Sequence, residues 1–517
     1  MQVHPIQSHV GLTGKEFIGL SSPRTITIIN NKLKVTNVHV VELGESSKTS
    51  YACLTNTILR SLKLTSAPLM LPPQYITTSF STPVSCILLN EQTKETMELK
   101  NSTFRLQRHI TMELNIAKKK NLKQKQLVAF KISSPRNTTT YCDIVVLPQK
   151  RNDDDGDTTI HVYMDTDEVN SSMYKDALSY DLYIQSEVQH DNLLMNFTPI
   201  MHVDTIIDDG RKNVWDIEQQ PRPNKQLYPI ANETDIVENI HFQNPSSDIN
   251  VKDAELTIDT SNRHLHLSPE DLSILFPGKK LRLKKAVAYI PEFIAKYTGF
   301  AAKETVTIRN VETGDEIRHL RVLGPVRKRT QIELAYTDCL NLGVEAPARI
   351  SGDNVNSGAK CILIAEDDDG NLTNNQVELK SGIVRAWRHL HIYEDPIAER
   401  LGVVSGDLLT VGIKSPKNTT IFHDVLVRVG NDPDGVPGSG IVSSIISYLK
   451  PTLLAYGYPA LRFVRGTGDA MYIHLDTDEA NAACIGNATN YTLYQQIGKE
   501  KLRLIGTTRL ETIESKM

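Results

Sequence analysis

One half of this 517-residue chain repeats the other, and no other feature of the sequence restricts its fold more strongly. Three motifs of the N-terminal part return in the C-terminal part in the same order. The matched segments are 104–114 with 384–394, 134–148 with 415–429, and 163–172 with 474–483. Such a repeat indicates that one structural unit is built twice. We therefore expect residues 1–175 to be a diverged copy of residues 251–517, with residues 176–250 as a connector.

The repeated parts consist of short strand-like segments. Runs such as LLTVGIK and DVLVRV are rich in β-branched residues and are bounded by Gly, Asn, Asp or Pro, which favours strands joined by turns. A short helix is expected at 268–276, where Ser268 is the N-cap, and another at 394–402, where Gly402 ends it. This pattern predicts a mainly β chain with short α caps, organised as tandem β-barrel domains.

Charge and composition argue against several classes of protein. The formal net charge is −4 and the pI about 6.4, so no strong field attracts nucleic acid. No run approaches the ~20 apolar residues that a membrane-spanning helix requires. The six cysteines lie far apart without a CxxC pair, which argues against a disulfide framework and a thiolate metal site. We expect a cytoplasmic protein that binds neither nucleic acid nor membranes.

Two Arg-His-Leu-His sequences mark the candidate chemistry. They carry His264 with His266 and His389 with His391. Side chains two residues apart on a strand point to the same face, so each pair can reach one metal ion. Packed histidines readily explain one such pair, but two pairs at equivalent places of a repeat favour metal ligands. Neutral imidazoles are typical zinc ligands, and catalytic zinc sites take three protein ligands.

Each histidine pair then requires a third ligand. Glu333 and His474 lie in apolar, strand-like surroundings, where an unpaired polar group would be costly. They are therefore the preferred candidates. His319, His423 and Glu479 are weaker candidates because they lie nearer the polar ends of their segments.

Six ordered motifs of the C-terminal half resemble those of a known family. They are RHLHLSPEDL, RVLGPVRKRTQIELAYTD, APARISGD, RAWRHLHIYEDP, DVLVRV and MYIHLDTDEANAA. Over residues 255–490 they are similar to the phosphate propanoyltransferases of propanediol utilisation, which are zinc-dependent phosphotransacylases. The resemblance implies two β-barrel domains with a dinuclear zinc site between them. It also implies a reversible reaction in which a short-chain acyl-CoA, propionyl-CoA or acetyl-CoA, and phosphate give an acyl phosphate and coenzyme A.

The resemblance assigns roles to individual residues of this chain. One zinc ion would be held by His264, His266 and Glu333, and the other by His389, His391 and His474. Arg327 matches the arginine that binds phosphate. The positions that contact coenzyme A in the family correspond to Ser261, Arg321, Ser351 and Asn481. Residues 430–468 are an insertion relative to the family, which leaves the preferred acyl chain open.

The N-terminal copy has lost most of these ligands. Its residues at the matching histidine positions are His9 and Gly11, His109 and Thr111, and Tyr163. Neither Arg327 nor Glu333 has a clear counterpart. We therefore expect this copy to be non-catalytic. Since members of the family tend to be dimeric, we expect either a homodimer or an intramolecular pseudo-dimer in which this copy acts as an attached partner.

Two other classes of function remain possible from the sequence. A metal-dependent hydrolase of acyl-CoA or of phosphoesters could use the same ligands with water as the nucleophile. A hydrolase that does not bind phosphate has no evident use for Arg327. A structural or regulatory protein would fit the degenerate N-terminal copy, but the complete ligand set of the C-terminal half argues against it.

Overall fold

The structure is a computed structural model of the whole chain. It describes residues 1–204, 241–243 and 256–509 with gaps at 22, 44–48, 72–80, 135–136, 150–158, 187–195, 262, 279–280, 282–300, 325, 347, 350–359, 380–381, 393–394, 416–417, 430–470, 486–487, 489 and 497–500. The 430–468 insertion and Ser351 therefore lie outside the described residues.

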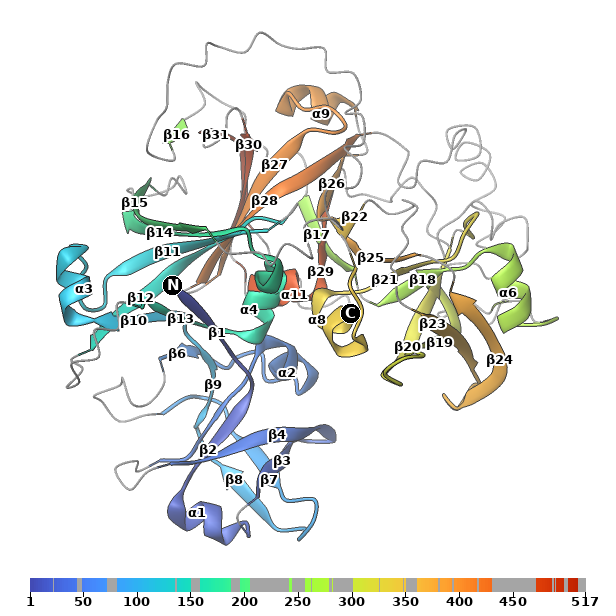
Figure 1. Cartoon of the computed structure of the whole chain (residues 1–517), viewed down its shortest axis with the longest axis horizontal. Helices are drawn as coiled ribbons and strands as arrows, with labels where there is room; N and C mark the ends of the chain where they lie inside the picture. The colour runs from blue at the N-terminus through green and yellow to red at the C-terminus, as the bar shows by residue number, and fades with distance from the viewer. Residues whose placement is uncertain are drawn as a thin grey trace.

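Two curled sheets of eight strands have the same strand order (Figure 1). The first has the order β6-β9-β5-β2-β4-β3-β7-β8 and the second β22-β25-β21-β18-β20-β19-β23-β24. The first is built from β2 (His9–Thr13), β3 (Thr25–Asn30), β4 (Leu33–Leu43), β5 (Tyr51–Cys53), β6 (Leu69–Met70), β7 (Cys86–Leu89), β8 (Thr96–Leu99) and β9 (Thr103–Leu106). The second is built from β18 (His264–His266), β19 (Ala301–Asn310), β20 (Glu316–Leu323), β21 (Gln331–Glu333), β22 (Ala348–Arg349), β23 (Cys361–Glu366), β24 (Leu372–Leu379) and β25 (Ile383–Ala386). Each encloses its own apolar core.

The third sheet has fifteen strands and joins the two halves. The N-terminal half supplies β1 (Gln2–Ile6), β10 (His109–Glu113), β11 (Leu127–Ser133), β12 (Thr139–Gln149), β13 (His161–Asp165), β14 (Ser179–Ser186) and β15 (Asn196–Asp204). The remaining strands are β16 (His241–Gln243), β17 (Leu256–Ser261), β26 (His389–Ile392), β27 (Leu408–Ser415), β28 (Asn418–Val429), β29 (Met471–Asp476), β30 (Asn490–Gln496) and β31 (Lys501–Arg509). The halves meet where β12 pairs with β28, with Tyr141 opposite Thr420.

Short helices cover the ends of the strands, in matching places of the two halves. They are α1 (Gly14–Gly19), α2 (Asn56–Ser61), α3 (Leu114–Lys119), α4 (Thr166–Ser171), α6 (Pro269–Leu275), α8 (Tyr336–Leu342), α9 (Asp395–Leu401) and α11 (Thr477–Ala482). Both predicted helices are present: Ser268 accepts the Asp271 backbone N–H as N-cap of α6, and Gly402 follows α9 with φ +66°. No helix among the described residues is long and apolar enough to cross a membrane.

The predicted mainly β, internally duplicated fold is confirmed. The repeat also continues past residue 175, because β14 pairs with β11 as β30 pairs with β27, and β15 pairs with β14 as β31 pairs with β30. We therefore place the end of the N-terminal copy after Asp204. The connector is correspondingly shorter than the sequence indicated.

Buried ion pairs fasten the helices that follow β13 and β29. Asp165 caps α4 by accepting the Glu168 backbone N–H at 2.9 Å, and Arg105 Nε lies 2.7 Å from the same carboxylate. In the other copy Asp476 caps α11 and pairs with Arg385 in the same manner. A buried guanidinium is tolerated only with such partners, so each pair specifies one position of the helix relative to the sheet.

Removing one partner of such a pair is expected to destabilise the protein strongly. Asp165→Ala leaves Arg105 buried beside a weaker partner, and breaking a buried pair in this way costs about 3–5 kcal/mol. Chemical denaturation followed by circular dichroism measures the effect. Glu91→Ala is the control, because that carboxylate pairs with Lys94 on the exposed surface. Equal denaturation midpoints for the two variants would contradict the role given to Asp165.

Candidate metal centre

The first ligand group combines two histidines of one strand with a glutamate of the next. His264 and His266 lie on β18, and the antiparallel register of β21 places Glu333 directly opposite His264. The potential metal-binding atoms of the three residues all lie within 4.8 Å of one another, and all three residues are buried. The intervening Leu265 points into the apolar core, so the strand alternation expected from the sequence holds here.

The Glu333 carboxyl group is held in its ionised form. Burial by itself raises the pKa of Glu333, but the nearby His264, Arg327 and His266 outweigh that effect and hold the pKa well below its usual range. His264 Nε2 lies 3.3 Å from Glu333 Oε2. An ionised carboxylate beside two imidazoles is a donor set suited to zinc.

The second ligand group consists of three histidines. His389 and His391 lie on β26, and His474 lies on β29 directly opposite His389. Their potential metal-binding atoms also lie within 4.8 Å of one another. His389 Nδ1 is 2.8 Å from the Trp387 carbonyl oxygen, which leaves Nε2 directed at His391 Nε2, 3.0 Å away.

His389 and His391 are held in their neutral form. Burial, together with the neighbouring His474 and Arg428, lowers the pKa of His389 to about 3. Burial and the neighbouring rings lower the pKa of His391 as well. A metal ion binds the neutral imidazole, so these two residues need no deprotonation before they bind a metal.

The two ligand groups adjoin each other. β21, which carries Glu333, pairs with β25, and β25 packs against β29, which carries His474 (Figure 1). The charge of Glu333 acts directly on the pKa of His389, across the boundary between the groups. The arrangement therefore offers two neighbouring three-ligand sites between the two sheets of the C-terminal copy.

Arg327 lies beside the first group. Its Nη1 is 3.9 Å from Glu333 Oε1 and donates a hydrogen bond to Gln331 Oε1. Its side chain is 11% exposed, so the guanidinium sits at the edge of the site and not in bulk solvent. That position can present a cation to an anion bound at the ligands.

Arg428 is a second cation at the site, and the sequence analysis missed it. It lies on β28 opposite His391 in parallel register. Its charge lowers the pKa values of both His389 and His391, which places it near their rings. An arginine in the otherwise apolar run DVLVRV was the available signal.

The residues predicted to contact coenzyme A do not all lie in one place. Arg321 lies on β20 opposite His264 in parallel register, and Ser261 ends β17. Asn481 is buried, and its carboxamide donates to Thr57 Oγ1 at 2.6 Å and accepts from Arg60 Nη1 at 3.0 Å. Asn481 thus takes part in the contact between the copies, and its contact with coenzyme A stays a prediction.

Strand pairing identifies the counterparts of the first group in the N-terminal copy. Here β2 pairs with β5, so Cys53 stands opposite His9 where Glu333 stands opposite His264. Gly11 replaces the second histidine, and a Cβ atom at that position would lie 2.7 Å from the Tyr51 ring. Tyr51 therefore fills the volume that the second imidazole would need.

The counterparts of the second group form a stack of rings. Tyr163 lies between His109 and His4, with ring centroids 4.9 Å from each, and His4 Nε2 lies 2.9 Å from His161 Nδ1. Within the described part of the N-terminal copy, no three potential ligands come together as they do in the C-terminal copy.

Comparison with known proteins gives matches in both halves. The family model described as phosphate propanoyltransferase matches residues 21–175 and 257–434. A phosphate propanoyltransferase of Shewanella putrefaciens is 33% identical over 226 residues, 44% of this chain and 81% of that protein. One of Thermotoga maritima is 34% identical over 235 residues, 45% of this chain and 86% of that protein. One of Limosilactobacillus reuteri is 32% identical over 235 residues, 45% of this chain and 84% of that protein.

Loss of one histidine should remove one metal ion. His389→Ala leaves the second group with His391 and His474, so zinc in the purified full-length protein should fall from about two ions per chain to about one. Elemental analysis measures this content. His109→Phe is the matched control, since it changes the counterpart of His389 and retains the ring stack. A metal loss in the control equal to that of His389→Ala would refute the assignment.

Proposed function

The chain belongs to the phosphate propanoyltransferase family, and we propose that its C-terminal half transfers a short acyl group between coenzyme A and phosphate at two zinc ions. The N-terminal copy takes no part in the chemistry, because it lacks both ligand groups. Propionyl-CoA or acetyl-CoA, phosphate, the acyl phosphate and coenzyme A are the substrates and products.

One observation carries this proposal. Two three-ligand groups adjoin each other, and an arginine stands beside each: Arg327 beside Glu333, and Arg428 beside His391. Phosphate is a multiply charged anion, so several cationic partners are needed to offset the loss of its hydration when it binds. A hydrolase that does not bind phosphate has no need of these two arginines.

The donor sets fit zinc. Five imidazoles and one ionised carboxylate, arranged in threes within 4.8 Å, match the three protein ligands of an open zinc site. When bound, zinc would supply a Lewis acid that polarises the acyl carbonyl and stabilises the departing thiolate. His264, His266 and Glu333 would hold one ion, and His389, His391 and His474 the other.

The protein's own groups bind and orient phosphate. Arg327 presents a planar fork of N–H donors, which suits two phosphate oxygens at once. Arg428 adds a second cation beside His391, which it faces in the register of β26 and β28. With the anion held against the acyl carbon, the attack becomes effectively unimolecular, and the burial of the surrounding strands limits competition from water.

The transfer is direct. A phosphate oxygen forms the new bond to the acyl carbon, the carbon–sulfur bond breaks, and coenzyme A leaves as a thiolate that takes a proton from solvent. An acyl-enzyme would require a reactive side chain. Cys339, the thiol nearest in sequence to Glu333, is 1% exposed, and burial raises its pKa, so it remains protonated and packed.

Release of coenzyme A should depend on phosphate. The purified full-length protein is expected to release free thiol from propionyl-CoA or acetyl-CoA only when phosphate or arsenate is present, because the oxyanion is the nucleophile. A thiol reagent assay in buffer with and without the oxyanions measures this. Equal release without either oxyanion would establish a hydrolase and reject the proposed transfer.

Arg327 should affect phosphate and not the metal. Arg327→Ala is expected to lower kcat/KM for phosphate about 100-fold, which corresponds to about 2.7 kcal/mol, because a charge-assisted contact is lost. Zinc content should remain unchanged. Arg329→Ala provides a control from the same segment, where the arginine is exposed. Unaltered phosphate kinetics in Arg327→Ala, or loss of zinc from it, would remove this role.

A further inference from the structure

The two copies meet through reciprocal contacts. Asn170 of the N-terminal copy donates to Thr337 Oγ1 of the C-terminal copy at 2.8 Å, and Asn481 of the C-terminal copy donates to Thr57 Oγ1 of the N-terminal copy at 2.6 Å. α4 packs directly against α11 at this place. These two hydrogen bonds are counterparts of each other, which is the pattern of a two-fold interface.

A second set of reciprocal contacts lies where β12 meets β28. The Thr138 backbone N–H donates to Asp424 Oδ2 at 3.2 Å, and the Thr419 backbone N–H donates to Asp143 Oδ2 at 2.8 Å. Asp143 and Asp424 both have positive φ, +60° and +58°. Because these two equivalent residues share the same rare backbone conformation, the two copies contribute the same local geometry to the contact.

The N-terminal copy has kept this contact while it lost the ligands. Four of the six ligand positions differ, but eight residues at or beside the contact are the same in both copies. The identical pairs are Thr57 and Thr337, Arg105 and Arg385, Arg108 and Arg388, Asp143 and Asp424, Asp165 and Asp476, Asp167 and Asp478, Glu168 and Glu479, and Asn170 and Asn481. Within one chain, the ligand positions have therefore diverged independently of the contact.

The strands that carry the second ligand group end at this contact. Arg388 directly precedes His389, and its Nε lies 3.0 Å from Glu479. Asp476 follows His474 by two residues, caps α11, and pairs with Arg385. His389 and His474 face each other in register on paired strands, and these ion pairs hold the adjoining strand ends beside α11.

The N-terminal copy completes the partners of these arginines. Thr139 Oγ1 accepts from Arg388 Nη2 at 3.2 Å, and the Ser171 carbonyl oxygen accepts from Arg385 Nη2 at 3.0 Å. Without the N-terminal copy, Arg385 and Arg388 would keep their carboxylate partners Asp476 and Glu479, but each would lose one buried hydrogen-bond acceptor, which is costly for a charged donor.

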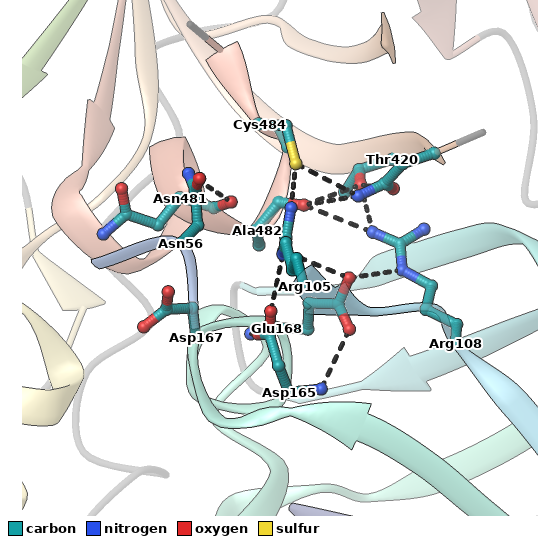
Figure 2. Close-up of polar contacts among 12 residues, drawn as sticks. Asn56, Arg105, Arg108, Asp165, Asp167, Glu168, Thr420, Asn481, Ala482 and Cys484 are labelled. Carbon is teal, nitrogen blue, oxygen red and sulfur yellow. Dashed lines mark hydrogen bonds and ion pairs between the residues drawn. The ribbon is translucent and has the colours of Figure 1, made fainter. Parts of the chain in front are cut away.

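Arg108 of the N-terminal copy reaches in the opposite direction (Figure 2). Its Nη2 donates to Thr420 Oγ1 at 2.7 Å and to the Ala482 carbonyl oxygen at 3.2 Å, and its Nη1 donates to the Thr419 carbonyl oxygen at 2.9 Å. Ala482 ends α11, and Thr420 lies on β28, the strand that pairs with β26. One side chain of the N-terminal copy thus holds two elements that flank the second ligand group.

We propose that the N-terminal copy is a built-in partner subunit whose residues Arg108 and Thr139 position His389, His391 and His474 for metal binding and turnover. They are positioning residues, because neither touches a ligand atom or a substrate. The inference rests on the proposed function for its catalytic readout, but its metal readout stands apart from it. It explains why a copy that has lost most of the ligands still shares eight residues at or beside the contact with the other copy.

The test uses full-length variants and the rate at which a chelator removes zinc. Arg108→Met and Thr139→Val should release one of the two zinc ions faster by about tenfold to a hundredfold, the range typical when a group that orients metal ligands is removed. The other ion should leave at the unaltered rate, because the first group lies on β18 and β21. In both variants kcat should fall, while KM for phosphate stays within about twofold, because Arg327 is untouched.

Thr111→Val is the matched control. It is the same substitution as Thr139→Val at another buried strand threonine of the N-terminal copy, the counterpart of His391. Its zinc release and kcat should equal those of the unsubstituted protein. Release from Thr139→Val and Arg108→Met at the control rate would overturn the proposal, and so would equal acceleration of both ions, which indicates general loosening.

Failure of this inference can be told apart from failure of the proposed function. If the unsubstituted protein binds two zinc ions but shows no phosphate-dependent thiol release, the proposed function is refuted, and the release rates still decide the role of the N-terminal copy. If Arg108→Met does not fold, Thr139→Val decides the matter, because it removes a single hydroxyl acceptor.

Discussion

Buried pairing between arginines and carboxylates is the interaction on which the rest of the molecule depends. Arg105 with Asp165, and Arg385 with Asp476, stand in the interior where an uncompensated charge would be prohibitive. Each carboxylate also caps a short helix and ends a strand of the large sheet. The pairs therefore hold a strand, a helix and the neighbouring copy together at one point. The candidate metal ligands adjoin this point, so their positions are fixed by it as well.

The fold of each copy does not depend on the presence of the candidate metal ligands. The same strand order and the same capped helices occur in both copies, yet Gly11, Tyr51 and Cys53 occupy the region of one ligand group and a ring stack occupies the other. A buried site that loses its metal must fill its volume and satisfy its polar groups. Stacked rings and a packed thiol do this in the N-terminal copy, which still packs against the C-terminal copy.

The sequence identified the residues of the candidate ligand groups more completely than the polar residues around them. Period-two alternation put each pair of histidines on one face, and apolar context singled out Glu333 and His474, which do lie against them. Arg428 was missed because a single arginine in a strand has no spacing signature. Asn481 was assigned to coenzyme A, whereas its carboxamide contacts the other copy, since a motif does not reveal which of its polar residues is covered by a distant segment.

Local rules of backbone geometry and the internal repeat were enough to determine the mainly β class, the duplication, the capped helices and the residues of the two candidate ligand groups. Tertiary structure alone decided that the two ligand groups adjoin, that Cys53 stands where the C-terminal copy has Glu333, and that the repeat runs to Asp204. It also decided that the copies share one sheet and exchange hydrogen bonds. The reason is that strand pairing between segments hundreds of residues apart depends on register and packing, and neither is written in the spacing of residues along the chain.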